Sequence, residues 1–450
     1  MVYDSYSILK TGKDQTGEAY PLTFKMGAGR PAGYVYFSIP FVATFGPSVW
    51  GVRGLSIFSG LGIIILMFFF GKKLFNEKVG LVASFLTSIS LWDLYLSRAG
   101  FEAHFALFLA LLGVVLFVYK KYIPMAVFWG LAIFSYPTFK LTIPLLFLIL
   151  LLLNGFKKVF KNKIFLISIL ILASFAGFAL NETFKGVSEQ RFLSINVFSD
   201  TNLKESIIQK INEQRNLSTF PEVLKPLIYN KPLKYSRILF ENYLDNLSPH
   251  FLYLRGDGNP RHNPGETGMF YLVELPLLFV GLYFLAKGEK KKLCLLVLWI
   301  LIVPLATMLT GEPHGLRNNF IIPPFVLISS FALTKISKKL SIIAFTLIGI
   351  QLIFVLMTVY FYAPNKFGSF WSARARDVVL EVINQKDKYE TIVLSTNIDN
   401  VEYAYITYTK VDPNEVIFQY GKLPKKYDNV IITDKVSQYI NTENILILEE

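Results

Sequence analysis

The chain has 450 residues, of which 53% are hydrophobic and only 17% are charged, and its mean hydropathy is +0.45. Soluble domains carry about 25% charged residues, so this balance excludes an ordinary soluble protein and indicates a membrane protein. The net charge of +13 would suggest nucleic-acid binding in a soluble chain, whereas here its placement must be considered first. The single cysteine, Cys294, excludes an internal disulfide framework.

The first 53 residues are polar apart from one apolar stretch, "GYVYFSIPFVATFG" (33–46). This stretch is too short for a transmembrane span, which needs about 20 apolar residues, and predicts an interfacial or re-entrant helix. No signal peptide is recognisable at the start.

Apolar segments of roughly spanning length follow at ten places. Two of them are weaker candidates, because 122–136 is short and 79–96 contains Trp92 and Asp93. The ten predicted spans are approximately 54–71, 79–96, 102–119, 122–136, 139–154, 164–181, 268–286, 292–310, 318–335 and 340–362.

Lysines gather in alternate connections between these predicted spans. The five connections carry 16 basic residues against two acidic ones, Glu77 and Glu289, and they lie at 72–78, 120–121, 157–163, 287–292 and 335–339. Because Lys and Arg accumulate on the cytoplasmic side, this alternation predicts that these connections are cytoplasmic. It also explains much of the positive charge without a nucleic-acid partner.

The remaining segments are then expected outside the cytoplasm, including 1–53, the long connection 182–267 and the tail from 363. Nothing apolar precedes residues 1–53 to carry them across a membrane. We therefore expect a complete protein to have a further N-terminal helix, with its native start upstream of Met1.

The long outer connection 182–267 is expected to contain helices, because a structureless loop of this length is unusual. The candidates are "NLKESIIQKINEQRN" and "PLKYSRILFENYLDNL". The connection ends in "SPHFLYLRGDGNPRHNPGETG" (248–268), which is rich in Gly, Pro, His, Arg and Asp. Such a piece is either an ordered functional loop or a turn-rich connector.

The tail from 364 changes in composition and predicts a small α/β domain. "SARARDVVLEVINQ" (372–385) has the period of an amphipathic helix, and "VEYAYITYTK" (401–410) is ambiguous between helix and strand. Short strands are predicted at 390–395, 415–420, 429–434 and 445–450. With no Gly-rich phosphate loop or metal-ligand cluster, this tail is expected to be structural or to recognise an acceptor.

The clearest candidate chemistry lies in "WDLYLSRAGFEAHFALF" (92–108), where Glu102 begins a predicted span at its outer end. Arg98 and His104 are close by in sequence, and Asp93 could equally pair with Arg98. Ionisable groups at membrane depth are costly and usually have a role. The alternative is ordinary charge placement at a helix N-terminus, which the helix dipole favours.

Further basic and polar side chains are expected on the same outer face. Guanidinium groups bind phosphate oxygens through two donors, so several arginines beside a bilayer suit a lipid-borne phosphate. The alternative for each is headgroup contact or a structural ion pair. The substrate-binding candidates are Arg30, Arg98, His104, Asp257, Arg261, His262, His314 and Arg317. The sequence contains no GxxxxGK[ST], HExxH or GxSxG motif and no cysteine pair.

The order of these stretches resembles the polytopic GT-C glycosyltransferases, the group of protein O-mannosyltransferases and bacterial aminoarabinose transferases. The matching stretches are "YDSYSILKTGKD", "GRPAGYVYFSIPFVATFG", "VRGLSIFSGLGIIILMFFFGKKLFNEKVGLVASFLTSIS", "SRAGFEAHFALFLALLG", "SPHFLYLRGDGNPRH" and "PHGLRNNFIIPPF". The resemblance implies an inverting enzyme that uses a polyprenyl-phosphate sugar donor outside the cytoplasm, with membrane lipids around it and an acceptor that the sequence does not identify.

The resemblance also implies roles for individual residues. Glu102 matches a carboxylate near the site, Arg30 in "RPA" matches a phosphate-binding basic residue, and Arg317 in "HGLRNN" is a second phosphate candidate. The family's acidic pair is expected just before "YDSYSILKTGKD", where this chain has only Met1 and Val2. Asp4 is the only acid nearby and is the alternative catalytic candidate. No metal is required, because a monophosphate leaving group needs little metal assistance.

The expected architecture is therefore an all-α polytopic GT-C-like domain at 1–363, with about ten transmembrane helices, followed by a small extracytoplasmic α/β domain at 364–450. The expected activity is sugar transfer at the outer face of the cell membrane, without a cofactor. Because the acidic pair is missing, the alternative expectation is that this chain is inactive in transfer. The competing functions are a catalytically degenerate binding protein and a transporter or flippase of a lipid-linked glycan, although no internal repeat supports the latter.

Overall fold

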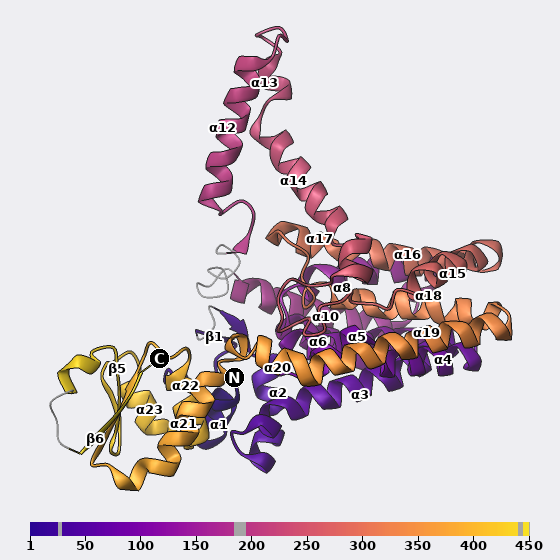
Figure 1. Ribbon diagram of the computed structural model, residues 1–450. Helices are drawn as coiled ribbons and strands as arrows, with labels where there is room; N and C mark the ends of the chain where they lie inside the picture. The colour runs from indigo at the N-terminus through magenta and orange to yellow at the C-terminus, as the bar shows by residue number, and fades with distance from the viewer. Residues whose placement is uncertain (26–28, 184–194, 440–443, 450) are drawn as a thin grey trace.

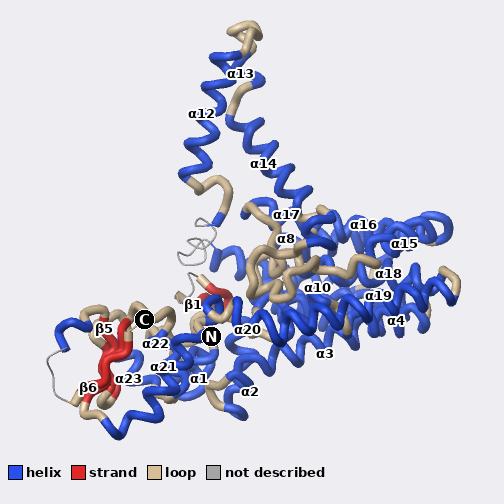
Figure 2. Tube along the Cα trace, viewed as in Figure 1, coloured by secondary structure: helices blue, strands red, loops and turns tan. Residues whose placement is uncertain are grey.

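The computed structural model describes residues 1–25, 29–183, 195–439 and 444–449. A bundle of helices forms the larger part, a helical hairpin projects from it, and a small unit with a sheet lies at one end (Figures 1 and 2). The bundle comprises α2 Gly33–Phe45, α3 Val49–Leu74, α4 Glu77–Ser88, α5 Leu91–Ser97, α6 Glu102–Val118, α7 Tyr122–Ser135, α8 Phe139–Asn154, α9 Phe156–Phe160, α10 Lys163–Thr183, α15 Glu274–Gly288, α16 Lys290–Ile302, α17 Pro304–Thr307, α18 Ile322–Lys335 and α19 Lys338–Met357.

Helices occupy all ten places where the sequence predicts spans, but the count of ten transmembrane helices is not confirmed. Within the described ranges, four helical stretches are long and apolar enough to cross a membrane: Val49–Leu74, Lys163–Thr183, Lys290–Thr310 and Lys338–Lys366. The pair α4 and α5, bent by 54°, makes a fifth candidate, and several apolar helices are shorter. The chain is thus a mostly helical, multi-pass membrane protein with four to five spans by this measure.

Small residues let the bundle helices approach closely. A Cβ added at Gly71 of α3 would lie 2.9 Å from Gly80 Cα of α4, and one added at Gly281 of α15 would lie 2.5 Å from the Ile328 carbonyl oxygen of α18. Packing through small residues is a main source of helix association in membranes, since lipid is as apolar as the side chains.

Replacement of Gly281 with alanine is therefore expected to destabilise the bundle by about 1–3 kcal/mol, the usual cost of overpacking, because a backbone atom blocks the new methyl group. The measurement is thermal unfolding of the detergent-solubilised chain. Gly349→Ala on α19 is the matched control, because a Cβ there has no neighbour within 4 Å. Equal unfolding temperatures for both variants would contradict the prediction.

Three of the lysine-rich connections meet at one end of the bundle. The Phe75 ring, after α3, stacks on Phe331 of α18 with centroids 4.7 Å apart, and Lys292 Nζ lies 4.9 Å from the Phe75 centroid. The structure thus agrees with the prediction that lysine-rich connections lie at one end of the bundle. The side of the membrane on which this end lies remains a prediction.

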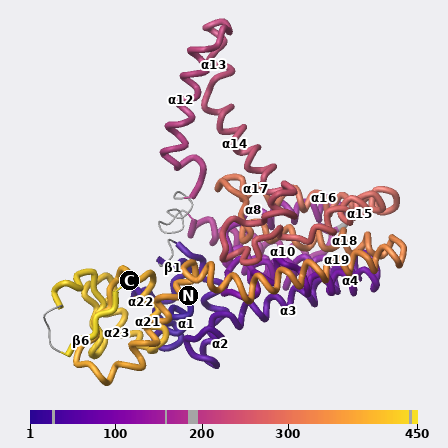
Figure 3. Tube along the Cα trace, in the orientation of Figure 1, coloured from indigo at the N-terminus to yellow at the C-terminus, as the bar shows by residue number. Residues whose placement is uncertain are grey.

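The long connection forms a projecting helical hairpin (Figure 3). Its helices are α12 Thr201–Leu217, α13 Lys225–Ile228 and α14 Lys231–Asp245. Side-chain caps start the two long ones: Asp200 accepts from Leu203 N–H, and Asn230 accepts from Leu233 N–H. Both helices predicted in this connection are confirmed, while residues 184–194 of it lie outside the described part.

The C-terminal unit is a four-stranded sheet covered by helices, in the order β4-β5-β3-β6. Strands β3 Thr391–Ser395, β5 Val430–Thr433 and β6 Ile445–Leu448 are parallel, and β4 Lys425–Tyr427 is antiparallel to β5. The helices are α21 Ala373–Gln385, α22 Val401–Tyr408 and α23 Pro413–Gln419.

The α/β character of the tail is confirmed, with one wrong strand. Residues 415–420 fall mostly in α23, where Asp412 caps the helix by accepting from Asn414 N–H and Pro413 starts it. The apolar letters "VIF" suggested a strand, but the cap and proline before them begin a helical turn. The ambiguous stretch 401–410 is helical in α22.

The first helix, α1 Val2–Thr11, packs against the C-terminal unit as well as against α2. Tyr3 belongs to the hydrophobic core of that unit, and its hydroxyl donates to the Val411 carbonyl at 2.8 Å. On the other side, Ser5 Oγ donates to the Val35 carbonyl at 3.0 Å. Helix α1 therefore connects the two parts of the molecule.

Candidate functional site

An apolar cavity of about 300 Å³ opens beside α8, and its walls come from segments far apart in sequence. Two of its lining side chains are cationic: Lys140 Nζ donates to Thr183 Oγ1 at 2.7 Å, and Arg317 Nη1 donates to Thr310 Oγ1 at 2.6 Å. The remaining lining residues are Gly29, Tyr136, Pro137, Thr138, Leu141, Ile195, Ala306 and Leu309. The cavity thus combines apolar walls with two positive charges.

Beside this cavity, Arg30 meets Glu102. Gly29, which lines the cavity, has φ +88° and places Arg30 on the short strand β2 Arg30–Pro31, paired with β1 Thr23–Phe24. Arg30 Nε lies 3.5 Å from Glu102 Oε1, and the Glu102 side chain is only 8% exposed. Glu102 is the first residue of α6, where the helix dipole favours a negative charge.

A polar cleft of about 810 Å³ lies on the other side of the segment 309–317. That segment contributes Leu309, Thr310 and Arg317 to the apolar cavity and Glu312 and Pro313 to the cleft. The other residues lining the cleft are Asp245, Ser248, His250, Phe251, Arg255, Gly256, Asp257, Gly258, Pro260, Asn263, Glu266 and Phe367. One short segment therefore separates an apolar, cationic cavity from a polar, carboxylate-bearing cleft.

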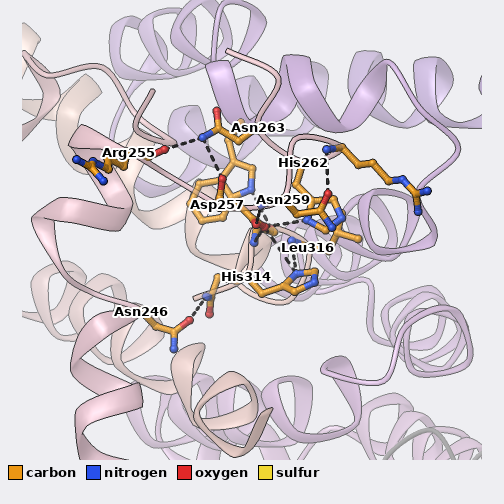
Figure 4. A network of polar contacts seen from close by, with 12 residues as sticks. Asn246, Arg255, Asp257, Asn259, His262, Asn263, His314 and Leu316 are labelled. Carbon is orange, nitrogen blue, oxygen red and sulfur yellow. Dashed lines mark hydrogen bonds and ion pairs between the residues drawn. The ribbon is translucent and has the colours of Figure 1, made fainter. Parts of the chain in front are cut away.

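Asp257 holds the segment 309–317 in position through contacts with His314 and Gly315 (Figure 4). Its Oδ2 atom lies 2.8 Å from His262 Nδ1 and 3.9 Å from His314 Nδ1, and it accepts a hydrogen bond from Gly315 N–H. The His262 and His314 rings lie 4.6 Å apart between centroids. Asp257 and His262 are buried, so the contacts form away from bulk water.

The protonation state of Asp257 follows from its burial and its contacts. Burial by itself raises the pKa of Asp257, but the hydrogen bond and charge of His262, the charge of His314 and the Asn259 N–H outweigh it, so the pKa of Asp257 lies below its ordinary value. An ionised Asp257 accepts from His262 Nδ1–H, which fixes the orientation of the His262 ring.

The same three side chains could hold a divalent cation. Asp257, His262 and His314 each offer one ligand atom, and these atoms lie within 4.8 Å of one another. An Asp and two His suit zinc or a similar ion. In the geometry described, however, His314 Nδ1 accepts from Leu316 N–H at 3.2 Å, so that atom already has a protein donor.

The group formed by Asp257, His262 and His314 lies next to Glu102. Phe101, the residue before Glu102, packs edge-to-face on His262 with ring centroids 5.4 Å apart. The structure therefore brings five predicted site residues into one region: Arg30, Glu102, Asp257, His262 and His314, with Arg317 on the segment between the two hollows.

The remaining predicted site residues lie elsewhere. His104 is fully buried in the bundle, where its Nε2 lies 2.8 Å from Asp93 Oδ1, so Asp93 pairs with His104 rather than with Arg98. Arg98 and Arg261 line a third hollow. Asp4 is buried in α1, where Oδ1 accepts from Gln15 Nε2 at 2.8 Å and Oδ2 lies 3.2 Å from the Met1 amino group.

The sequence arguments missed residues that hold or complete the site. Asn263 Nδ2 donates to three carbonyls, those of Arg255, Asp257 and Thr267, at 2.7 to 3.2 Å, and so fixes the loop that carries Asp257. The only signal was its place in a turn-rich stretch. Lys140 was missed because it stands alone in an apolar helix, although an isolated cation at membrane depth is itself a signal.

These features define the class to which the fold belongs: a polytopic, mostly helical membrane protein with its polar site at one end of the bundle. No family model matches the sequence, and no curated protein matches it either. The structural similarity to ArnT from Cupriavidus metallidurans in the apo state has a TM-score of 0.58 at 9% identity, over 99% of this chain and 87% of ArnT.

ArnT bound to undecaprenyl phosphate gives a TM-score of 0.56 at 9% identity, over 91% of this chain and 79% of ArnT. The oligosaccharyltransferase of Archaeoglobus fulgidus is less similar, with a TM-score of 0.48 at 14% identity over 92% of this chain and 60% of its own. The chain thus has the fold of ArnT, which agrees with the fold that the resemblance in its sequence predicted.

Proposed function

We propose that this protein is a membrane glycosyltransferase that moves a sugar from a polyprenyl-phosphate donor to an acceptor on the extracytoplasmic face, with inversion at the anomeric carbon. The observation that carries the proposal is the segment 309–317, which separates an apolar cavity containing Lys140 and Arg317 from a polar cleft containing Asp257. A donor with a hydrocarbon chain, a phosphate and a sugar needs these environments side by side.

The apolar cavity suits the phosphate end of the donor and the first isoprene units. Arg317 and Lys140 supply positive charge for the phosphate, and Arg30 lies at the border of the cavity beside Gly29. Charge-assisted hydrogen bonds to phosphate are roughly twice as strong as neutral ones. That a structure of the similar ArnT contains undecaprenyl phosphate supports this choice of donor.

In the proposed reaction the acceptor hydroxyl attacks the anomeric carbon while the bond from that carbon to the phosphate oxygen breaks. The electron pair of the broken bond leaves with polyprenyl phosphate, whose charge the cations stabilise. Glu102 takes or orients the hydroxyl proton. Attack from the face opposite the leaving phosphate inverts the anomeric centre.

The polar cleft is the proposed place for the sugar and the acceptor. Asp257 lines the cleft and fixes the orientation of the buried His262 through Nδ1. His314, on the segment between the two hollows, is proposed to contact the same substrates. The C-terminal unit, 364–450, is proposed to be a separate extracytoplasmic domain that supports acceptor recognition.

We propose that transfer needs no metal, even though Asp257, His262 and His314 could bind one. Treatment of the purified protein with EDTA is therefore expected to leave the transfer rate unchanged within about twofold, since the cations that face the phosphate are side chains. The measurement is the rate before and after chelation, with zinc added back as the control. A loss of activity that zinc restores would assign these residues to a metal site.

The test of the function is transfer of labelled sugar from a synthetic polyprenyl-phosphate sugar in proteoliposomes that contain the full chain. Product formation with a panel of sugars and acceptors supports the proposal. Donor binding without transfer to any acceptor would instead indicate a degenerate binding protein. Movement of intact donor between leaflets without transfer would indicate a flippase.

A further inference from the structure

A third hollow, the arginine pocket, contains four of the eleven arginines of the chain: Arg53, Arg98, Arg261 and Arg376. Its volume is about 260 Å³. The four side chains come from α3, from the residue after α5, from the loop before α15, and from α21 of the C-terminal unit. The other lining residues are Tyr95, Ala99, Pro264, Val359, Ala363, Pro364, Phe367, Gly368, Trp371 and Ala373.

The arginine pocket has no acidic residue in its lining. Among the described residues, no carboxylate lies within 4.0 Å of the guanidinium groups of Arg53, Arg98 or Arg261, while Arg376 pairs with its exposed neighbour Asp377. The three guanidinium groups without a carboxylate partner, of which those of Arg53 and Arg261 are exposed, line one small space and repel one another. A bound anion would remove this repulsion.

Aromatic and backbone contacts hold two of the arginines in place. The Arg98 guanidinium lies 5.8 Å from the centroid of the Tyr360 ring, and that of Arg261 lies 6.0 Å from the centroid of Trp371. Arg261 Nε also donates to the Phe370 carbonyl. These contacts fix the direction of the side chains without neutralising their charge, which leaves donors for a ligand.

The guanidinium group of Arg98 is partly buried, so water screens its charge less than at an open surface. Burial lowers the pKa of the Arg98 guanidinium and the positive charge of Arg53 adds to this effect, although the group stays charged at every physiological pH. An anion in such a place gains more from each contact than it would at an open surface.

The arginine pocket lies where spanning helices end. Arg53 is in the second turn of the spanning helix α3, and Val359 and Ala363 belong to the last turns of the stretch Lys338–Lys366. The pocket shares no lining residue with the apolar cavity that contains Lys140 and Arg317. It shares Phe367 with the polar cleft, and it lies at the boundary between the apolar bundle and the C-terminal unit.

We propose that the arginine pocket is a second phosphate-binding site, which takes the phosphate group of an ester at the membrane boundary and thereby joins the C-terminal unit to the bundle. The planar, two-donor geometry of arginine matches phosphate oxygens. The phosphate can come from a lipid headgroup or from free phosphate. This site lies apart from the apolar cavity proposed for the phosphate of the donor.

Binding is tested with the purified full chain in an uncharged detergent, without any sugar donor. The probes are dioctanoyl phosphatidic acid, inorganic phosphate and dioctanoylglycerol, which has the same chains without phosphate, and occupancy is measured by native mass spectrometry and thermal shift. Binding of phosphatidic acid alone assigns a lipid headgroup, and equal binding of inorganic phosphate assigns free phosphate. If neither probe binds, the proposal is wrong.

Arg98→Gln and Arg376→Gln are each expected to weaken binding of the phosphate probe about tenfold, since each removes a charge-assisted contact. Arg374→Gln is the matched control on the same helix as Arg376, because Arg374 is exposed, as Arg376 is, but does not line the pocket. Affinity equal to that of the wild type in both pocket variants would overturn the proposal. So would a loss of the same size in Arg374→Gln.

A second measurement uses the wild type, so it does not depend on the folding of a variant. Phenylglyoxal modifies arginines, and peptide mapping gives the rate at each position. The phosphate probe is expected to slow modification of Arg53 and Arg98 but not of Arg237, which is exposed on α14. Equal rates with and without probe would exclude the site.

The outcome is also separable from the fate of the proposed function. Arg317→Gln, which alters the apolar cavity, is expected to leave this binding unchanged. If Arg317→Gln abolishes binding while Arg98→Gln does not, the phosphate occupies the apolar cavity and the arginine pocket is not a site.

Discussion

Replacement of Glu102 with glutamine is expected to lower the rate of sugar transfer by about 10²–10⁴-fold, the usual contribution of a positioned general base. Glutamine keeps the size of the side chain but cannot take a proton. Glu102 is nearly buried, faces Arg30 at 3.5 Å and stands next to Phe101, which packs on His262. The loss is expected in kcat with little change in the KM for the donor, measured with labelled donor in proteoliposomes.

Asp4→Asn provides the matched control, because Asp4 is the other carboxylate that the sequence offers as a catalytic residue. Asp4 Oδ1 already accepts from Gln15 Nε2, and no described contact joins Asp4 to Glu102. We expect a change of less than about fivefold in kcat for Asp4→Asn, well below the effect of removing a general base. If Asp4→Asn lost activity while Glu102→Gln kept it, the assignment of the base would be reversed.

A purely structural role for Glu102 gives a different result. A carboxylate at a helix N-terminus contributes about 0.3–1 kcal/mol to stability when it only complements the helix dipole. In that case Glu102→Gln would lower the unfolding temperature slightly and leave kcat unchanged. Measuring both quantities on the same preparation separates the two roles.

The helices of the bundle could be predicted from the sequence because an apolar run of sufficient length has few alternatives to a buried or membrane helix. Their exact extent could not, as α4 and α5 show: Asn76 and Ser90 each cap a helix, and the 54° bend between the helices falls at a break that hydropathy does not register. The prediction of a strand at 415–420 was wrong for a similar reason, because Asp412 caps a helix there despite the apolar residues that follow.

The sequence predicts which types of residue form the candidate site, but not which of these residues lie together. Histidines and arginines near predicted outer ends were identified, yet only the fold shows that His262 and His314 meet at Asp257 whereas His104 turns inward to Asp93. The meeting of His314 with Asp257 depends on packing between segments more than 50 residues apart, for which a single sequence carries no signal, and the pairing of His104 with Asp93 depends on how α5 and α6 lie against each other. For the same reason Arg376, from the C-terminal unit, could not be placed beside Arg98.

Replacement of Arg317 with glutamine is expected to raise the KM for the polyprenyl-phosphate donor about 10–100-fold, as is Lys140→Gln, because hydrogen bonds to charged groups contribute about 1.5–3 kcal/mol each. Both side chains line the apolar cavity, where Arg317 donates to the Thr310 hydroxyl and Lys140 to the Thr183 hydroxyl. The expected change in kcat is smaller, because these cations contact the phosphate before as well as during the reaction.

The phosphate contact itself is tested by using polyprenyl phosphate without the sugar as a competitive inhibitor. In Arg317→Gln, its inhibition constant is expected to rise by the same factor as the KM. In Arg317→Lys, the inhibition constant is expected to lie between those of the wild type and Arg317→Gln, since lysine keeps the charge but loses the two-donor geometry. Leu141→Phe, which narrows the same cavity without changing its charge, is expected to weaken long-chain donors more than short-chain ones. If all three variants bound the inhibitor as the wild type does, the donor would occupy another hollow, and the role of the segment 309–317 as the wall between donor and acceptor would be lost with it.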